Sequence, residues 1–245
     1  MTDTATSASA ASDGERRPVA LSSRPLARGM AVLGVAAVLT GVLVWAVFAY
    51  LRSSVPSVDF TKTAGPVNLR VQTVAAIGFG PHPTWVSYLV QDPSGKWVHS
   101  TIWQLPADRQ INVTVDEYDS GGALRNSLWG GITGTLDSQA TVNGKPTSVV
   151  DPAAGNGIAH TFNVPDLGIN VPLYGISSKA KNPCSAAPCD TSSDHTTITF
   201  SFHTPAGGGD YRWQCFVPCG LAYLNGNGGP MAAIGFMSGF LKVVA

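Results

Sequence analysis

An uncharged apolar run near the N-terminus limits most strongly how this chain can fold. Residues 30–51 read MAVLGVAAVLTGVLVWAVFAYL and include no charged side chain. With a rise of 1.5 Å per residue, a helix of about 22 residues spans roughly 30 Å, which is the thickness of the hydrocarbon core of a bilayer. Charged residues make up only 12% of the whole chain. The sequence therefore predicts a single transmembrane helix over residues 29–52.

The charges on either side of this run predict its orientation. Four arginines precede it: Arg16, Arg17, Arg24 and Arg28. Only Arg52 follows closely, so the positive-inside rule places residues 1–28 in the cytoplasm and the rest of the chain outside the cell membrane. The tail is rich in Ala, Ser and Thr without an apolar period, which predicts disorder. The alternative is a signal peptide cut after Ala49, although the apolar run is longer than the usual signal core of about 7–15 residues.

The remainder, residues 53–245, has the pattern of an all-β domain. From Asp59 onward apolar residues recur with a period of two, and Gly, Pro, Asn, Asp and Ser lie between the apolar segments. The predicted strands cover 67–76, 84–91, 97–105, 110–118, 158–164, 196–204, 211–217 and 240–245. Several short strands with turn signals indicate a sandwich or a barrel. Turn-rich segments near 119–156, 174–195 and 221–236 are predicted insertions.

Three separate motifs in the C-terminal half carry the residues for metal chemistry. His160 lies in AHTFNVPDLGI, Cys215 and Cys219 lie in WQCFVPCG, and Met237 lies in FMSGFLKVV. Thiolate and imidazole are the ligands of electron-transfer copper, and a thioether is its weak axial ligand. Two cysteines four residues apart can direct both sulfurs into one site, which a histidine from an earlier strand would complete. The motifs therefore predict a copper site.

In this order, HTF-x-VPDLGI, C-x-x-x-C-G and M-x-G-x-L-x-V resemble the cupredoxin domain of cytochrome c oxidase subunit II, over roughly residues 105–245. The resemblance implies a cupredoxin-like Greek-key β-sandwich after the transmembrane helix. It also implies a dinuclear copper centre of the CuA type. The ligands it implies are the imidazole of His160, the bridging thiolates of Cys215 and Cys219, the backbone carbonyl of Val217 and the axial thioether of Met237.

The chain departs from that family at one ligand. The family has a second histidine four residues after the second cysteine, where this chain has Tyr223, and it usually has two membrane spans. One expected state is an altered CuA or mononuclear copper site, which His203 joins if it faces the ligands. In another, the metal is lost and the two cysteines form a disulfide or a thiol pair. In a third, another chain supplies the missing ligand.

The function that the resemblance implies is that of an electron-transfer or accessory component of a haem-copper respiratory oxidase. Its partners would be the haem-bearing catalytic subunit and a cytochrome c-like or other redox donor. The alternatives are a redox-inactive structural cupredoxin of a respiratory complex and an extracytoplasmic copper carrier. Beyond residue 52 the chain has ten Lys and Arg against twelve Asp and Glu, with no basic stripe, so nucleic acid is not an expected partner.

Other interpretations apply to some of the same residues. His160 would otherwise be a half-buried strand histidine with a hydrogen-bond partner, and Met237 a core residue. Outside the cytoplasm, disulfides are allowed, and Cys184 and Cys189 in a proline-rich loop are the predicted pair.

An acidic cluster follows the predicted strand 110–118. It consists of Asp116, Glu117 and Asp119. The favoured interpretation is a solvated strand end, and the alternative is a patch that steers a basic redox donor.

Overall fold

The computed structural model divides into two units, residues 1–54 and 55–245, which are described separately. Within them the structure describes residues 25–51, with the backbone alone at 49–51, and residues 55–75, 85–219 and 228–245.

The first unit contains one long helix, α1 (Pro25–Leu51). It begins four residues before the start expected from the sequence, at a proline whose fixed backbone angle suits the first turn of a helix. Its segment Pro25–Phe48 has a mean hydropathy of 2.5. Within the described parts of the chain, it is the one helix long and apolar enough to cross a membrane. This helix could therefore anchor the chain, while its orientation stays a prediction.

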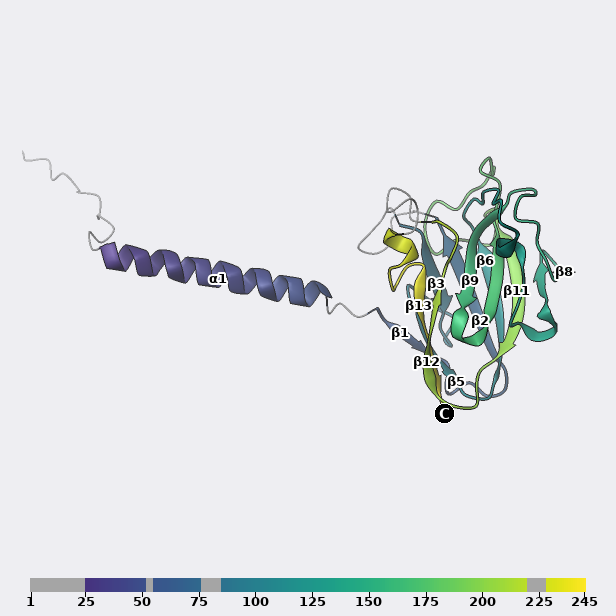
Figure 1. Ribbon diagram of the computed structural model, residues 1–245, viewed down its shortest axis with the longest axis horizontal. Helices are drawn as coiled ribbons and strands as arrows, with labels where there is room; N and C mark the ends of the chain where they lie inside the picture. Colours follow the sequence, from purple (N-terminus) through teal and green to yellow (C-terminus); the bar gives the residue numbers. More distant parts are fainter. Residues whose placement is uncertain (1–24, 52–54, 76–84, 220–227) are drawn as a thin grey trace, which may run out of the picture. The chain divides into compact units, whose positions relative to one another are not determined.

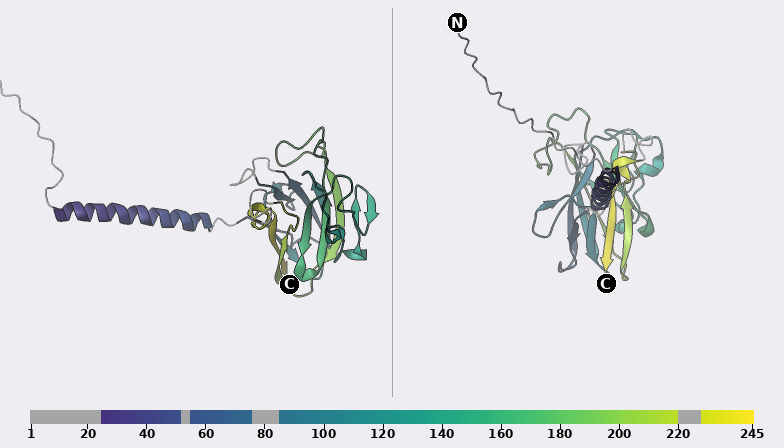
Figure 2. Two further views of the ribbon diagram at one scale, coloured as in Figure 1. Left: turned by 45° about the horizontal axis from the view of Figure 1, so that its top comes forward. Right: turned by 90° about the vertical axis from the view of Figure 1, so that its left-hand side faces the viewer.

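The second unit is a sandwich of two β-sheets, whose layers can be followed from three directions (Figures 1 and 2). The six-stranded sheet contains, from edge to edge, β1 (Ser57–Asp59), β5 (Ile102–Pro106), β13 (Ser238–Val244), β12 (Gly209–Gln214), β9 (Ile158–Val164) and β10 (Ile169–Tyr174). The seven-stranded sheet contains β4 (Trp97–Val98), β3 (Ser87–Gln91), β2 (Val67–Val74), β6 (Gln110–Glu117), β11 (Thr196–His203), β7 (Ala140–Val142) and β8 (Lys145–Thr147). The predicted fold class, an all-β sandwich preceded by one apolar helix, is confirmed.

All eight predicted strands are present, and the segment 97–105 is divided into β4 and β5. Four strands were not predicted. Two of them, β1 and β7, have only three residues, which is too short for an alternating pattern to show. The other two contain a proline, Pro146 in β8 and Pro172 in β10, and both strands lie at a sheet edge, where proline is tolerated.

The core lies between the sheets and is centred on two tryptophans. Trp103 of β5 and Trp213 of β12 are fully buried, and their rings stack with centroids 5.1 Å apart. Each indole Nε1–H donates to a backbone carbonyl at 3.0 Å, from Trp103 to Ser100 and from Trp213 to Thr101. A buried tryptophan needs such a partner for its N–H, so this pairing fixes both rings in the interior.

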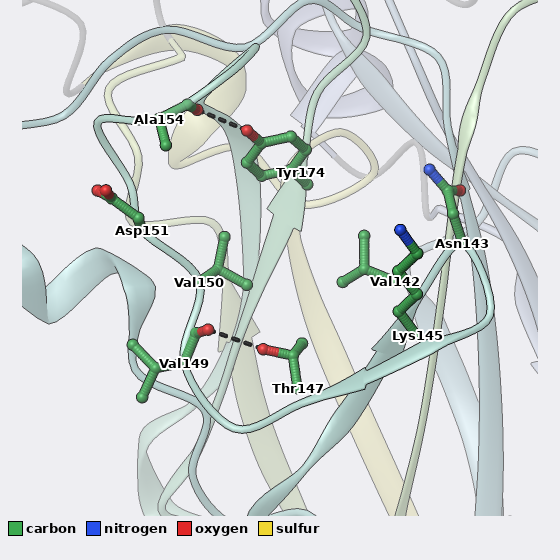
Figure 3. A pocket seen from close by; sticks show the side chains of 9 residues that line it. All are labelled: Val142, Asn143, Lys145, Thr147, Val149, Val150, Asp151, Ala154 and Tyr174. Atoms are coloured by element: carbon green, nitrogen blue, oxygen red, sulfur yellow. Dashed lines mark hydrogen bonds between the residues drawn. The ribbon is translucent and has the colours of Figure 1, made fainter.

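The first predicted insertion, 119–156, has local structure of its own. It contains the short helices η1 (Ser127–Gly130) and η2 (Leu136–Ser138) and the hairpin of β7 and β8. Next to β10 it borders a hollow of about 380 Å³, whose lining includes Val142, Lys145, Asp151 and Tyr174. Figure 3 shows the Tyr174 hydroxyl donating to the carbonyl of Ala154 across this hollow.

The second predicted insertion, 174–195, contains the predicted disulfide between Cys184 and Cys189, which is confirmed. The loop packs on the seven-stranded sheet because the Gln72 side chain both donates to and accepts from the backbone of Cys189, each at 2.8 Å. Of the third insertion, 221–236, the described part begins at residue 228 and includes η4 (Gly229–Met231).

The packing around Trp213 gives a prediction for Gly239, which lies opposite Trp213 in the register of β12 and β13. A Cβ atom at Gly239 would collide with the backbone carbonyl of Thr101. We expect Gly239→Ala to lower the free energy of unfolding by at least about 2 kcal/mol, as overpacking of a core does. The matched control is Gly207→Ala, where a Cβ has open space and should change stability little. Equal stability of the two variants in chemical denaturation would contradict this packing.

Candidate metal centre

Two adjacent strands bring His160 and Cys215 together. β12 lies beside β9 in the six-stranded sheet (Figure 1), with Gln214 paired to Asn163. Cys215 follows Gln214 directly, and the antiparallel direction carries the chain back along β9 toward His160. His160 is 1% exposed and Cys215 is fully buried.

Backbone hydrogen bonds hold the loop that begins at Cys215. The Cys215 N–H donates to the carbonyl of Met237 at 2.8 Å, which ties the loop to the start of β13. The next amide, Phe216 N–H, donates to Thr161 Oγ1 at 2.9 Å, which ties the loop to β9. The loop is therefore attached to strands on both sides of β12.

The donor atoms are spaced as one metal ion requires. Cys215 Sγ lies 3.7 Å from Cys219 Sγ and 3.8 Å from His160 Nδ1, and the three donor atoms all lie within 4.8 Å of one another. A tetrahedral ion with bonds of about 2.3 Å to sulfur and about 2.0 Å to nitrogen sets its donors ~3.5–3.8 Å apart. The two cysteines are free thiols. The group therefore fits a single soft ion with little movement.

Asp119, just beyond the end of β6, contacts the imidazole nitrogen of His160 that faces away from the sulfurs. Its Oδ2 lies 3.2 Å from His160 Nε2. If Nε2 carries the proton for this contact, the lone pair of Nδ1 faces the sulfurs. A carboxylate on the remote nitrogen is the usual partner of a metal-binding histidine, because it fixes the ring orientation and raises the basicity of the ligand.

The charges in this group depend on one another. Burial opposes the imidazolium of His160, but Glu117, Asp119 and Cys215 outweigh burial and raise its pKa well above 6.5. Burial would raise the pKa of Cys215, but its hydrogen bonds with Cys219 and His160 hold that pKa well below 9.0. The hydrogen bond that Cys219 donates to Cys215, together with burial, raises the pKa of Cys219. Without metal, the proton-poor sulfur is therefore Cys215.

The acidic cluster is not a solvated strand end, and that interpretation is wrong. Asp116 is 2% exposed and forms an ion pair with Arg70 at 3.2 Å. Glu117 is fully buried, and burial raises its pKa from 4.5 to about 8. Asp119 is bound to His160. The alternative of an exposed patch that steers a basic donor also loses its basis, because β6 turns Glu117 inward and the other two acids already have partners.

The remaining predicted ligands have different positions. The carbonyl oxygen of Val217 lies 3.6 Å from Cys215 Sγ, so this carbonyl lies beside the site. Met237 is fully buried and touches the site through its backbone, and the role of its thioether stays a prediction. His203 is half exposed and lies 3.8 Å from Asp108, so it does not join the group. Tyr223 lies outside the described residues.

The comparisons with known proteins do not assign this chain to a family. No protein-family model and no curated protein matches this chain. Among solved structures it is similar to reduced rusticyanin at 1.9 Å, with 17% identity and a TM-score of 0.33, over 79% of this chain and 87% of that one. It is also similar to rusticyanin from Thiobacillus ferrooxidans, with 14% identity and a TM-score of 0.32, over 77% of this chain and 82% of that one. A third rusticyanin structure, described as a copper protein, has 16% identity, a TM-score of 0.33, and coverage of 79% and 86%.

The contact between Asp119 and His160 gives a prediction for metal affinity. We expect Asp119→Ala to weaken metal binding by about 10–100-fold, because the imidazole loses the carboxylate that orients it. The matched control is Asp108→Ala, which removes the carboxylate beside the exposed His203 and should leave the affinity unchanged. Competition with a chromogenic chelator measures both variants, and equal affinities would exclude an orienting role for Asp119.

The pKa of Glu117 gives a prediction for the metal-free protein. Because folding raises this pKa from 4.5 to about 8, Glu117 stabilises the fold at low pH, and its contribution is lost as the pH rises from about 4.5 through 8. The loss is a few kcal/mol at most, since one pKa unit corresponds to about 1.4 kcal/mol. Chemical denaturation between pH 4 and pH 9 should show this decline, and Glu117→Gln should flatten it. A decline of the same size in the variant would assign it to other groups.

Proposed function

We propose that this chain is a membrane-anchored copper protein that serves as an electron-transfer or accessory component, similar to subunit II, of a haem-copper respiratory oxidase. One observation carries the proposal: a buried imidazole and two thiols, from segments 55 residues apart, have donor atoms within 4.8 Å of one another. An imidazole with two thiolates is a donor set that binds soft transition metals such as copper.

The residues of this chain would hold copper with three side chains. His160 would bind through Nδ1, because Asp119 occupies Nε2, and Cys215 and Cys219 would bind through Sγ. Bound copper would supply one-electron redox chemistry. Val217 and Met237 would complete the ligand set through a carbonyl and a thioether.

The surroundings of these donors suit electron transfer. Electron transfer is fastest when ligands move little between oxidation states, and donors supported by packed strands are held more precisely than donors on free loops. Here His160 is within β9, and the hydrogen bonds to Met237 and Thr161 fix the loop that carries Cys215. The apolar helix would keep the domain beside a membrane partner, which we propose to be the haem-bearing catalytic subunit, with a cytochrome c-like or other donor.

A copper carrier is the second candidate, and the position of Cys219 favours it. Cys219 is partly exposed, whereas Cys215 and His160 are buried. A partly exposed sulfur can be reached by a thiol of another protein, so copper could leave by exchange of ligands one at a time. Both functions require the same three donors, and they differ in whether copper stays bound during oxidation and reduction.

Copper binding by the purified full chain tests the proposal. The reduced protein in detergent micelles is incubated with copper, and the copper content and visible spectrum are recorded after removal of free metal. We expect bound copper and an intense thiolate-to-copper absorption, which His160→Ala and Cys215→Ser should both abolish. His203→Ala is the matched control and should leave content and colour unchanged, because His203 lies on the exposed face of β11.

The spectrum also separates the two forms of the site. A purple protein with two copper ions would support an altered CuA centre, and a blue or green protein with one ion would support a single-ion electron carrier. Colourless copper that a thiol-containing acceptor removes readily would favour the carrier. A reduced wild-type protein that binds no copper would contradict both functions.

A further inference from the structure

Glu117 is a carboxylate in a position that is otherwise apolar. The residues of β6 that share its inward face are Ile111, Val113 and Val115, which are buried core residues. Glu117 is fully buried like them. A buried carboxylate is strongly destabilising unless a hydrogen bond or an opposite charge compensates for the loss of water. Burial raises its pKa from 4.5 to about 8, so a nearby positive charge is needed to hold it as a carboxylate at neutral pH.

In the described part of the chain, the two oxygens of Glu117 have different surroundings. Its Oε1 accepts from the Asp119 N–H at 2.9 Å. Its Oε2 has no hydrogen bond of normal geometry among the described residues. The hydroxyl of Thr73, which is paired with Glu117 across β2 and β6, lowers the pKa of Glu117 but also stays outside normal hydrogen-bond geometry. Among the residues that the structure describes, one buried carboxylate oxygen of Glu117 is thus left without a hydrogen bond of normal geometry.

The positive charge next to Glu117 is at the metal group. His160 is the basic residue that interacts most strongly with Glu117, and the same imidazole faces Cys215 and Asp119. Three groups therefore favour a positive charge at this imidazole: Glu117, Asp119 and Cys215. When His160 binds a metal through Nδ1, the metal becomes the positive charge at this place.

We propose that Glu117 shifts the selectivity of the metal group toward doubly charged ions, so that it raises the affinity for Cu²⁺ relative to that for Cu⁺. The proposal rests on the proposed function, since it concerns the charge of the ion that the same three donors hold. A fixed carboxylate attracts an ion of charge two twice as strongly as an ion of charge one at the same place, and this difference is large in a buried site. Glu117 would act through its charge and not as a ligand, because it is not part of the group whose donors lie within 4.8 Å.

The test compares two neighbouring acids on opposite faces of β6. Full-length wild type, Glu117→Gln and Asp116→Asn are purified in detergent micelles, loaded with copper and titrated by spectroelectrochemistry at pH 9, above the pKa of about 8 of Glu117. We expect Glu117→Gln to change the ratio of Cu²⁺ to Cu⁺ affinity by about tenfold, as loss of a partner outside the ligand shell does. For a one-electron couple this raises the reduction potential by about 59 mV. Asp116→Asn should change the potential much less, because Arg70 already balances that charge.

Two further measurements separate a charge effect from damage to the fold. Zn²⁺ affinity should fall about 100-fold in Glu117→Gln and Cu⁺ affinity about tenfold, because the carboxylate attracts the doubly charged ion twice as strongly. Glu117→Asp keeps the charge and should retain most of the wild-type potential. Equal losses for both ions, equal effects of Gln and Asp, or an unchanged potential in Glu117→Gln would overturn the proposal and leave the proposed function intact. A wild-type chain that binds neither Cu²⁺ nor Cu⁺ would overturn both.

Discussion

The contact between the His160 imidazole and Cys215 Sγ organises the metal group of the sandwich domain. It exists because β9 and β12 are hydrogen-bonded neighbours, so a residue inside one strand and a residue just after the other lie side by side. Cys219 then returns to the same place within one short loop, which adds the second sulfur at 3.7 Å. Sandwich folds commonly place functional residues in loops at the ends of rigid sheets. The two cysteines of this site lie in such a loop, whereas the imidazole comes from inside strand β9.

Without a metal, the charged groups at this contact destabilise the folded domain, because they are removed from water. Burial penalises each charged group in the site, and the groups offset one another: Asp119 and Glu117 favour the imidazolium of His160, which in turn favours the thiolate of Cys215. Burial of the apolar core around Trp103 and Trp213 offsets the free-energy cost of burying these charged groups. A bound cation would replace the proton of His160 as the central positive charge, so metal binding and folding should be coupled.

The sequence predicted the strands well, because alternation is a local pattern, and it named the three side chains that the structure brings together. Alternation located β11, whose inward residues Ile198, Phe200 and Phe202 are buried as expected. The meeting of His160 with the cysteines followed from three motifs in a fixed order. The edge strands β8 and β10 were not predicted, because each contains a proline, and proline in a segment argues against a strand.

No sequence pattern predicts the two acidic residues that act on His160, Asp119 and Glu117. Asp119 lies 41 residues before His160, and no spacing rule joins a residue after β6 to a ring on the opposite sheet. Glu117 follows the strict alternation of β6, which alone would have marked it as inward, but its charge favoured the solvated interpretation. Carboxylates are usually exposed to water, so exposure is the expected position for Glu117. A carboxylate can be buried where a site supplies a compensating positive charge.

X-ray absorption at the copper edge of the loaded full chain tests the central claim most directly, because it counts the atoms bound to the metal. We expect sulfur scatterers at about 2.3 Å together with an imidazole nitrogen at about 2.0 Å, as in other sites with such ligands. A first shell of oxygen and nitrogen alone would show that the thiols of Cys215 and Cys219 do not hold the ion, and the account of this site would be wrong.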